Sequence, residues 1–201
     1  MTIRLADVSK RFGRQWIIRQ LSTEFEGGQT YGISGRNGSG KSTLLRMLAG
    51  QLSPSRGRVI FELNGQQVAP EKVYQYVSWT GPYFEIVEEL TLLEMLTFHY
   101  EIKRALPGLT ASSILERTGL TAFADRPLLD CSSGMRQRIL LATALYADTP
   151  LLLLDEPTVT LDANAADWFA NELRDFSSNR LVIVASNDPR DLATCGRVTD
   201  L

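Results

Sequence analysis

The chain has 201 residues, of which 44% are hydrophobic and 22% are charged, and its formal net charge is −2. This length and composition suit one or two domains with a sizeable core, and the weakly acidic balance offers no general field for binding nucleic acid. Cys131 and Cys195 lack metal-site spacing and predict free thiols in a reducing compartment, while no apolar run approaches a membrane span or a signal peptide.

The N-terminal part is predicted to be rich in β-structure. Short strands are expected over residues 3–5, 16–18 and 21–25, with turns at Gly13 and at residues 27–28. A fourth strand, Thr30–Ser34, is short and largely apolar, as expected for a buried parallel strand.

A glycine-rich loop follows this strand directly. It consists of Gly35, Arg36, Asn37, Gly38, Ser39, Gly40, Lys41 and Ser42, and it leads through Thr43 into a predicted helix over residues 43–49 that Gly50 ends. Backbone N–H groups of such a loop and helix start attract an anion. The loop therefore predicts a nucleotide site in which Lys41 reaches the β- and γ-phosphates and Ser42 ligates Mg²⁺. The plainer interpretation, a glycine-rich loop without a ligand, fits the strand and helix flanks less well.

A strand follows over residues 73–79, and the chain then becomes helical from about residue 83 to residue 130, with apolar residues at spacings of three and four. The only histidine, His99, falls here and is interpreted as a packing or surface helix residue.

A second buried strand is predicted over residues 151–154, and it runs into Asp155 and Glu156. Because ligands of an open α/β sheet sit beyond the carboxyl ends of its strands, both acids are expected beside the P-loop. Asp155 would hold Mg²⁺, and Glu156 would orient or deprotonate an attacking water. An acidic helix cap is the alternative for this pair taken alone. A helix near Ala163–Phe176 and a buried strand over residues 180–185 complete the predicted core.

Three further segments, together with the P-loop and the acidic strand, resemble those of an ATP-binding cassette (ABC) ATPase. Residues 131–138, read Cys-Ser-Ser-Gly-Met-Arg-Gln-Arg, resemble the family signature; residues 157–162 resemble the interface loop that ends in Leu-Asp; and residues 52–61 resemble the turn and strand after the P-loop helix. Phe12 falls where the family places an aromatic on adenine, although core packing is an equal alternative. The resemblance implies an α/β P-loop NTPase core with a mixed sheet, flanking helices and an N-terminal antiparallel part over residues 1–82 and 146–201. A helical subdomain over residues 83–145 would be inserted into it.

The resemblance also implies an ATPase that uses ATP and Mg²⁺. Two cassettes would clamp two ATP molecules head to tail, and Ser132 and Gly134 of one would contact the γ-phosphate held by the other. The expected partners are a second ABC ATPase subunit and a separate integral membrane permease, with no nucleic acid. The chain would be cytoplasmic and peripheral on the inner face of the membrane, in a short single cassette resembling haem exporters. A soluble ABC ATPase acting as an assembly scaffold or mechanochemical clamp is the alternative.

The sequence departs from the family pattern at three places. Asn187 stands where a histidine usually contacts the γ-phosphate, and it can donate a hydrogen bond but carries no proton charge. Gly81 or Pro82 stands where a glutamine is usual, with Gln75 a substitute only in another register. In the signature, Ser133 and Met135 replace glycine and glutamine. Because Glu156 is present, we expect a working but slow ATPase rather than a dead site.

Residues 79–94 correspond to the stretch that receives the coupling helix of the membrane subunit in the family. Its aromatic and acidic side chains would suit an amphipathic helix with basic residues; they are Tyr83, Phe84, Glu85, Glu88 and Glu89. A solvated acidic turn before a helix is an equal alternative.

Overall fold

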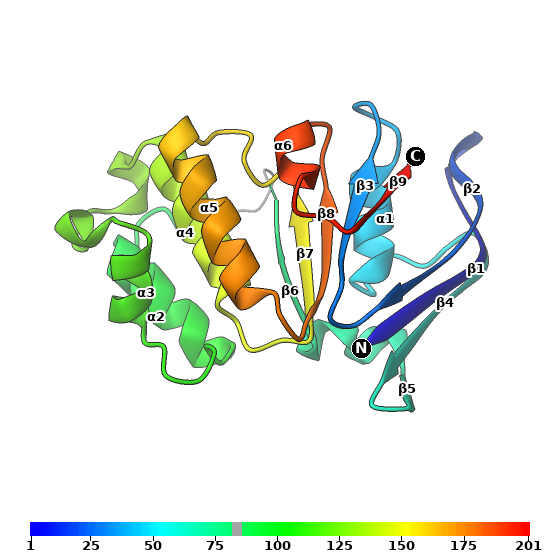
Figure 1. The fold of residues 1–201 in the computed structure, drawn as a ribbon, viewed down its shortest axis with the longest axis horizontal. Coiled ribbons are helices and arrows are strands. Elements are labelled where there is room, and N and C mark those ends of the chain that lie inside the picture. Colours follow the sequence, from blue (N-terminus) through cyan, green and yellow to red (C-terminus); the bar gives the residue numbers. More distant parts are fainter. Residues whose placement is uncertain (82–85) are drawn as a thin grey trace. The chain divides into compact units, whose positions relative to one another are not determined.

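The fold is described by a computed structural model for residues 1–81 and 86–201, shown in Figure 1. The chain forms two compact units, each built from separate stretches of sequence. The sheet unit comprises residues 1–79, 149–156 and 177–201, and the helical unit comprises residues 80–148 and 157–176. The boundaries predicted from the sequence, at residues 82/83 and 145/146, remain a proposal.

An antiparallel sheet forms the N-terminal part of the sheet unit. Its strands are β1 (Thr2–Phe12), β2 (Gln15–Glu26), β4 (Arg56–Leu63) and β5 (Gln66–Val68), in the order β2-β1-β4-β5. The two short strands predicted over residues 16–18 and 21–25 are in fact one continuous strand, β2. Phe12 pairs with Gln15 across a tight hairpin in which Gly13 has a φ of 56°, a conformation that favours glycine.

A second sheet carries the strands predicted around the nucleotide site. Its order is β6-β7-β8-β3-β9, from β6 (Val77–Thr80), β7 (Leu151–Asp155), β8 (Leu181–Ala185), β3 (Thr30–Ser34) and β9 (Arg197–Asp200). Strands β7, β8, β3 and β9 run parallel, so their carboxyl ends meet at one edge. The strand predicted over residues 73–79 is wrong in its first half, because Pro70–Gln75 form a 3-10 helix that starts on a proline.

Helix α1 (Lys41–Leu48) completes the core of the sheet unit. Its buried Leu44, Leu45, Met47 and Leu48 join one apolar cluster with side chains from both sheets, including Ile33 of β3. Side chains alternate along a strand, so Gly32 faces the opposite side of the sheet from Ile33. There a Cβ would stand 3.0 Å from Leu192 of α6 (Pro189–Leu192) and 3.3 Å from the Cys195 sulfur. One face of β3 thus meets α1 and the other meets α6, as Figure 1 shows.

The helical unit contains α2 (Leu92–Ile102), α3 (Ala111–Arg117), α4 (Ser133–Leu145) and α5 (Ala163–Phe176), with short 3-10 turns over Thr121–Phe123 and Leu128–Asp130. Thr91, Thr110 and Ser132 cap α2, α3 and α4 by accepting backbone N–H bonds, which explains where these helices begin. The Tyr146 hydroxyl donates a 2.7 Å bond to Glu172 of α5. Among the described residues, none of the helices is long and apolar enough to span a membrane.

Candidate active site

The P-loop connects β3 to α1 at the carboxyl edge of the parallel sheet. Its three glycines have φ values of 151° at Gly35, 84° at Gly38 and 112° at Gly40, conformations that other residues rarely adopt. A Cβ at Gly35 would lie 2.5 Å from Ser39 Oγ, and one at Gly40 would lie 2.8 Å from a methyl carbon of Ile17. Glycine is therefore required at both positions by space as well as by backbone angle.

Lys41 lies at the centre of the site, on the first turn of α1, and is buried although it is charged. Its Nζ donates a 2.8 Å hydrogen bond to the Gly35 carbonyl and forms an ion pair of 3.2 Å with Glu156 Oε1. Glu156 directly follows β7 and has a φ of 46°, an uncommon backbone conformation for a residue with a side chain. The predicted meeting of P-loop lysine and acidic strand in one place is thus present in the structure.

Asp155 ends β7 beside Lys41 and is buried. Burial raises the pKa of its carboxyl group, the hydrogen bond with Ser42 opposes that rise, and the neighbouring Glu156 adds to it. Its Oδ1 atom is buried and has no hydrogen-bond partner in the described part of the chain. An unpaired buried oxygen beside a serine hydroxyl is the kind of donor pair that Mg²⁺ uses together with substrate phosphates.

Asn187 follows β8 and reaches the P-loop from the neighbouring strand end. Its side-chain Nδ2 donates a 3.1 Å bond to Asn37 Oδ1, and its backbone N–H donates a 3.4 Å bond to Glu156 Oε2. The structure therefore places Asn187 with the P-loop and with Glu156, where its amide can donate to an anion.

Phe12 lies at the tip of the β1–β2 hairpin, and 52% of its surface is exposed. The core-packing alternative for this residue is therefore wrong. The Lys10 ammonium sits 5.3 Å from the ring centroid, and on the same hairpin Ile17 and Ile18 border the P-loop at Gly40. An exposed aromatic ring on a strand pair that touches the P-loop is available for stacking on a base.

The signature segment belongs to the helical unit. Ser132 caps α4 by accepting the Met135 N–H bond at 3.2 Å, and Ser133 is the first residue of that helix. A Cβ at Gly134 would stand 3.4 Å from the Thr160 carbonyl oxygen, in the loop that precedes α5. The signature and the interface loop are thus packed together at the start of α4.

Two residues of the site are absent from the sequence predictions. Ser186 Oγ lies 2.9 Å from Glu156 Oε2, and Asp191 contacts the same Ser186 oxygen. The position of Ser186 just after β8 was an available signal, because polar side chains at parallel strand ends gather at one edge. No sequence pattern pointed to Asp191. Pro82, Tyr83, Phe84 and Glu85 lie outside the described residues, whereas Gln75 ends the 3-10 helix rather than lying in a strand.

Comparison with known proteins decides the family. The sequence model of the ABC transporter family matches residues 18–159, more than half of the chain. The chain belongs to the ABC transporter family. Its relatives include the cytochrome c biogenesis ATP-binding export protein CcmA of Rhizobium etli, with 32% identity over 96% of this chain and 91% of that protein. The sulfate/thiosulfate import ATP-binding protein CysA of Thermosynechococcus vestitus is 34% identical over 81% of this chain and 49% of that one.

Solved structures agree on the fold. A dimeric ATP-binding cassette in a post-hydrolysis state with ADP and phosphate has a TM-score of 0.84 at 22% identity, covering 99% of this chain and 94% of that one. A structure of the ATP-binding subunit of an ABC transporter has the same TM-score at 21% identity, with 100% and 86% covered. The ABC cassette fold predicted from the sequence is confirmed.

This chain is an ATP-binding and ATP-hydrolysing subunit of the ABC transporter family. The comparisons favour this transporter function over the soluble scaffold.

Proposed function

We propose that this cassette hydrolyses MgATP at a low rate, with Lys41 and Glu156 as its central residues. The observation that carries the proposal is the position of Lys41 Nζ, 2.8 Å from the Gly35 carbonyl and 3.2 Å from Glu156, beside the unpaired Asp155 Oδ1. Charged groups that converge at a glycine-rich loop suit phosphate binding and water activation.

The roles follow from the positions. Lys41 would bind the β- and γ-phosphates, and Glu156 would orient and deprotonate the attacking water. Backbone groups of the loop and the start of α1 would surround the phosphates, through Gly35, Arg36, Asn37, Gly38, Ser39, Gly40, Ser42 and Thr43. A phosphate bound here would compete with Glu156 for Lys41, which would free the carboxylate to face water.

Ser42 and Asp155 are the residues that would hold Mg²⁺, which neutralises phosphate charge in this chemistry. Within the described residues no group of three histidine, cysteine, aspartate or glutamate side chains could hold a metal ion. The pair of Ser42 and Asp155 would therefore suit an ion whose remaining ligands are substrate oxygens and water.

The remaining contacts would come from Phe12 and from the partner cassette. Phe12 would stack on adenine, and Asn187 would donate to the γ-phosphate in place of histidine. The partner cassette would present its own Ser132 and Gly134 to the same γ-phosphate, at the start of α4 where an anion is favoured. Slow hydrolysis is expected because Asn187 cannot carry a proton charge and because the signature has Ser133 and Met135.

We place the subunit on the inner face of the cell membrane, docked on its permease through residues 79–94. Part of that segment, residues 82–85, lies outside the described residues, whereas Glu88 is half-exposed and forms an ion pair of 2.9 Å with Arg136. An acidic surface here would suit a basic amphipathic helix.

The test is the substitution Glu156→Gln, with the exposed Glu62→Gln as the matched control. We expect Glu156→Gln to reduce phosphate release at least a hundredfold, since it removes the base, while ATP still binds. Glu62→Gln should match the native protein in both measurements. Persistent hydrolysis in Glu156→Gln would refute the assignment, and native protein that binds MgATP but never releases phosphate would refute the ATPase proposal.

A further inference from the structure

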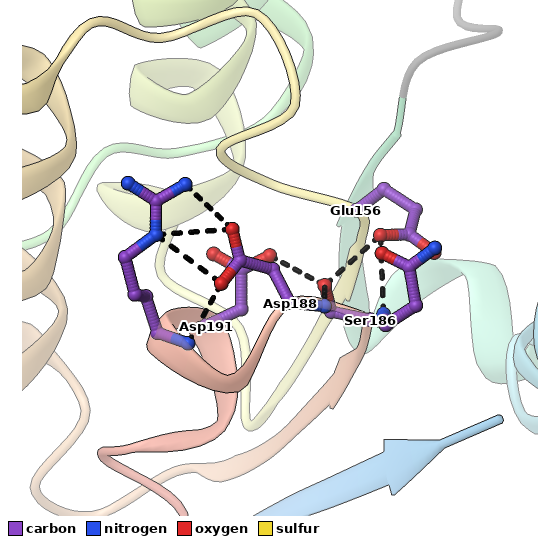
Figure 2. Close-up of polar contacts among 6 residues, drawn as sticks. Glu156, Ser186, Asp188 and Asp191 are labelled. Atoms are coloured by element: carbon purple, nitrogen blue, oxygen red, sulfur yellow. Dashed lines mark hydrogen bonds and ion pairs between the residues drawn. The ribbon is translucent and has the colours of Figure 1, made fainter.

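A buried hydroxyl connects Glu156 to a second carboxylate that the proposed chemistry does not use. Ser186 Oγ lies 2.9 Å from Glu156 Oε2 and 2.6 Å from Asp191 Oδ2, as Figure 2 shows. Ser186 is fully buried and Asp191 is 6% exposed. All three residues belong to the sheet unit.

Neighbouring groups use most of the hydrogen-bonding capacity of the Ser186 hydroxyl. Its Oγ accepts the backbone N–H of Asp188 at 3.0 Å, which fixes one lone pair of the oxygen. Its single hydrogen can be donated to only one carboxylate at a time, Asp191 or Glu156. When this hydrogen is donated to Glu156 Oε2, the 2.6 Å contact with Asp191 needs a proton on the Asp191 carboxyl group, which then donates to Ser186 Oγ and occupies its second lone pair.

Glu156 has an uncommon backbone conformation, and each oxygen of its carboxylate has its own partners. Its φ of 46° is uncommon for a residue with a Cβ, and its carboxylate is held from both ends. Lys41 contacts Oε1, whereas Ser186 Oγ and the Asn187 N–H contact Oε2. Since phosphate would draw Lys41 away from Oε1, the Oε2 contacts would be the ones that persist during catalysis.

The segment that carries Ser186 and Asp191 is itself fixed. Asp188 caps α6 through a 2.9 Å bond from the Arg190 N–H and forms an ion pair of 2.6 Å with the Arg190 guanidinium. Helix α6 contacts β3 and β8, and the Asp191 side chain that it carries is buried.

We propose that Ser186 and Asp191 are positioning residues for Glu156: Asp191 anchors the Ser186 hydroxyl, and Ser186 holds Glu156 Oε2 in line with the attacking water. This inference rests on the proposed role of Glu156. It assigns no contact with ATP to Ser186 or Asp191, so their loss should lower kcat and leave nucleotide affinity unchanged.

The experiment measures kcat and KM for MgATP and the ATP dissociation constant in Ser186→Ala, Ser186→Thr, Asp191→Ala and the double variant. Ser78→Ala is the matched control, because Ser78 is an equally buried serine of the sheet unit whose hydroxyl bonds to Arg180 and Thr149 instead. Glu156→Gln is measured in parallel.

We expect Ser186→Ala to lower kcat about tenfold with KM and ATP affinity within twofold of native, the size of one lost hydrogen bond to a charged group. Ser186→Thr should recover most of the loss, because it keeps the hydroxyl. Asp191→Ala should lower kcat about threefold to tenfold, and the double variant should be no slower than Ser186→Ala, since Asp191 acts through Ser186.

Several results would overturn the proposal. One is a native kcat in Ser186→Ala when Glu156→Gln is inactive, which would leave the role of Glu156 intact and remove only the positioning role. Another is a double variant whose loss equals the product of the single losses. A Ser186→Ala variant that lowers ATP affinity or behaves like Ser78→Ala would also overturn it. Should Ser186→Thr fold poorly, Asp191→Ala still tests the anchor, and a native kcat in that variant would overturn the proposal. If Glu156→Gln keeps its activity, the proposed function fails first.

Discussion

Substituting alanine for glycine at two positions of the P-loop should separate the cost of backbone strain from the cost of crowding by a neighbouring side chain. At Gly40 the φ is 112°, and a Cβ would meet the Ile17 methyl carbon at 2.8 Å and an Ile18 carbon at 3.3 Å. At Gly38 the φ is 84°, and a Cβ would meet nothing within 4 Å. Gly38→Ala is therefore the matched control for backbone strain without crowding.

The magnitudes follow from these distances. Backbone strain should cost about 1–2 kcal/mol in Gly38→Ala, the usual cost of a left-handed conformation with a Cβ. Gly40→Ala adds overpacking of about 1–3 kcal/mol, because the β-branched Ile17 side chain has little freedom to move away. The total for Gly40→Ala is then about 2–5 kcal/mol in the free energy of unfolding.

Urea unfolding followed by circular dichroism measures this difference. With a denaturant slope of about 2–3 kcal/mol/M, the urea midpoint should fall by about 0.6 M in Gly38→Ala and by about 1.4 M in Gly40→Ala, roughly twice as far. Equal midpoints for the two variants would refute the reasoning that crowding at Ile17 makes Gly40 obligatory. Titration with ATP should show weaker binding in both, because each Cβ lies on the loop that surrounds the phosphates.

Other residues of the site and surface give further predictions. Asn187→His should raise kcat about threefold to tenfold by adding a donor that can carry charge, and an unchanged or lower rate would contradict the role given to Asn187. Burial raises the pKa of Cys195 from 9.0 to about 11, so at pH 8 a thiol reagent should modify it about a hundredfold more slowly in the folded than in the urea-unfolded protein. Because the folded protein holds this proton more tightly, the raised pKa stabilises the fold below pH 9, and this stabilisation is lost as the pH rises toward 11. Equal reaction rates in the folded and unfolded protein would contradict the raised pKa. Glu89→Lys should reduce recovery of the membrane subunit in co-purification. It is a clearer test than Glu88→Lys, because Glu88→Lys also breaks the ion pair with Arg136. Undiminished recovery in Glu89→Lys would count against the docking surface.

The site could be predicted from sequence where its chemistry follows local pattern. The P-loop after Thr30–Ser34, the acids after β7 and the position of Asn187 after β8 each depend on a strand end, and parallel strands bring such ends to one edge. Ser132 was singled out by the resemblance to the family signature, and in the structure it caps α4, a position that serine favours.

The rest depends on tertiary contacts that no local pattern encodes. Asp191 looks like an ordinary polar residue of a short surface helix, and only the packing of α6 on the sheet buries its carboxylate against Ser186. The strand predicted over residues 73–79 failed because alternating apolar residues there also suit a 3-10 turn started by Pro70. Strand β2 runs through a break in alternation at Arg19 and Gln20, which its pairing with β1 tolerates by shifts in register.

The strand that leads into the P-loop is flanked by β8 and β9, whose residues all lie in the last 21 positions of the chain. During synthesis β3 is therefore made early but has neither neighbour in its sheet until β8 and β9 have left the ribosome. Its pairing with both strands joins residues distant in sequence, a class of contact that forms slowly. The nucleotide site thus assembles late relative to the synthesis of its own loop, and a nascent chain would acquire the phosphate-binding geometry only after β8 and β9 have been made.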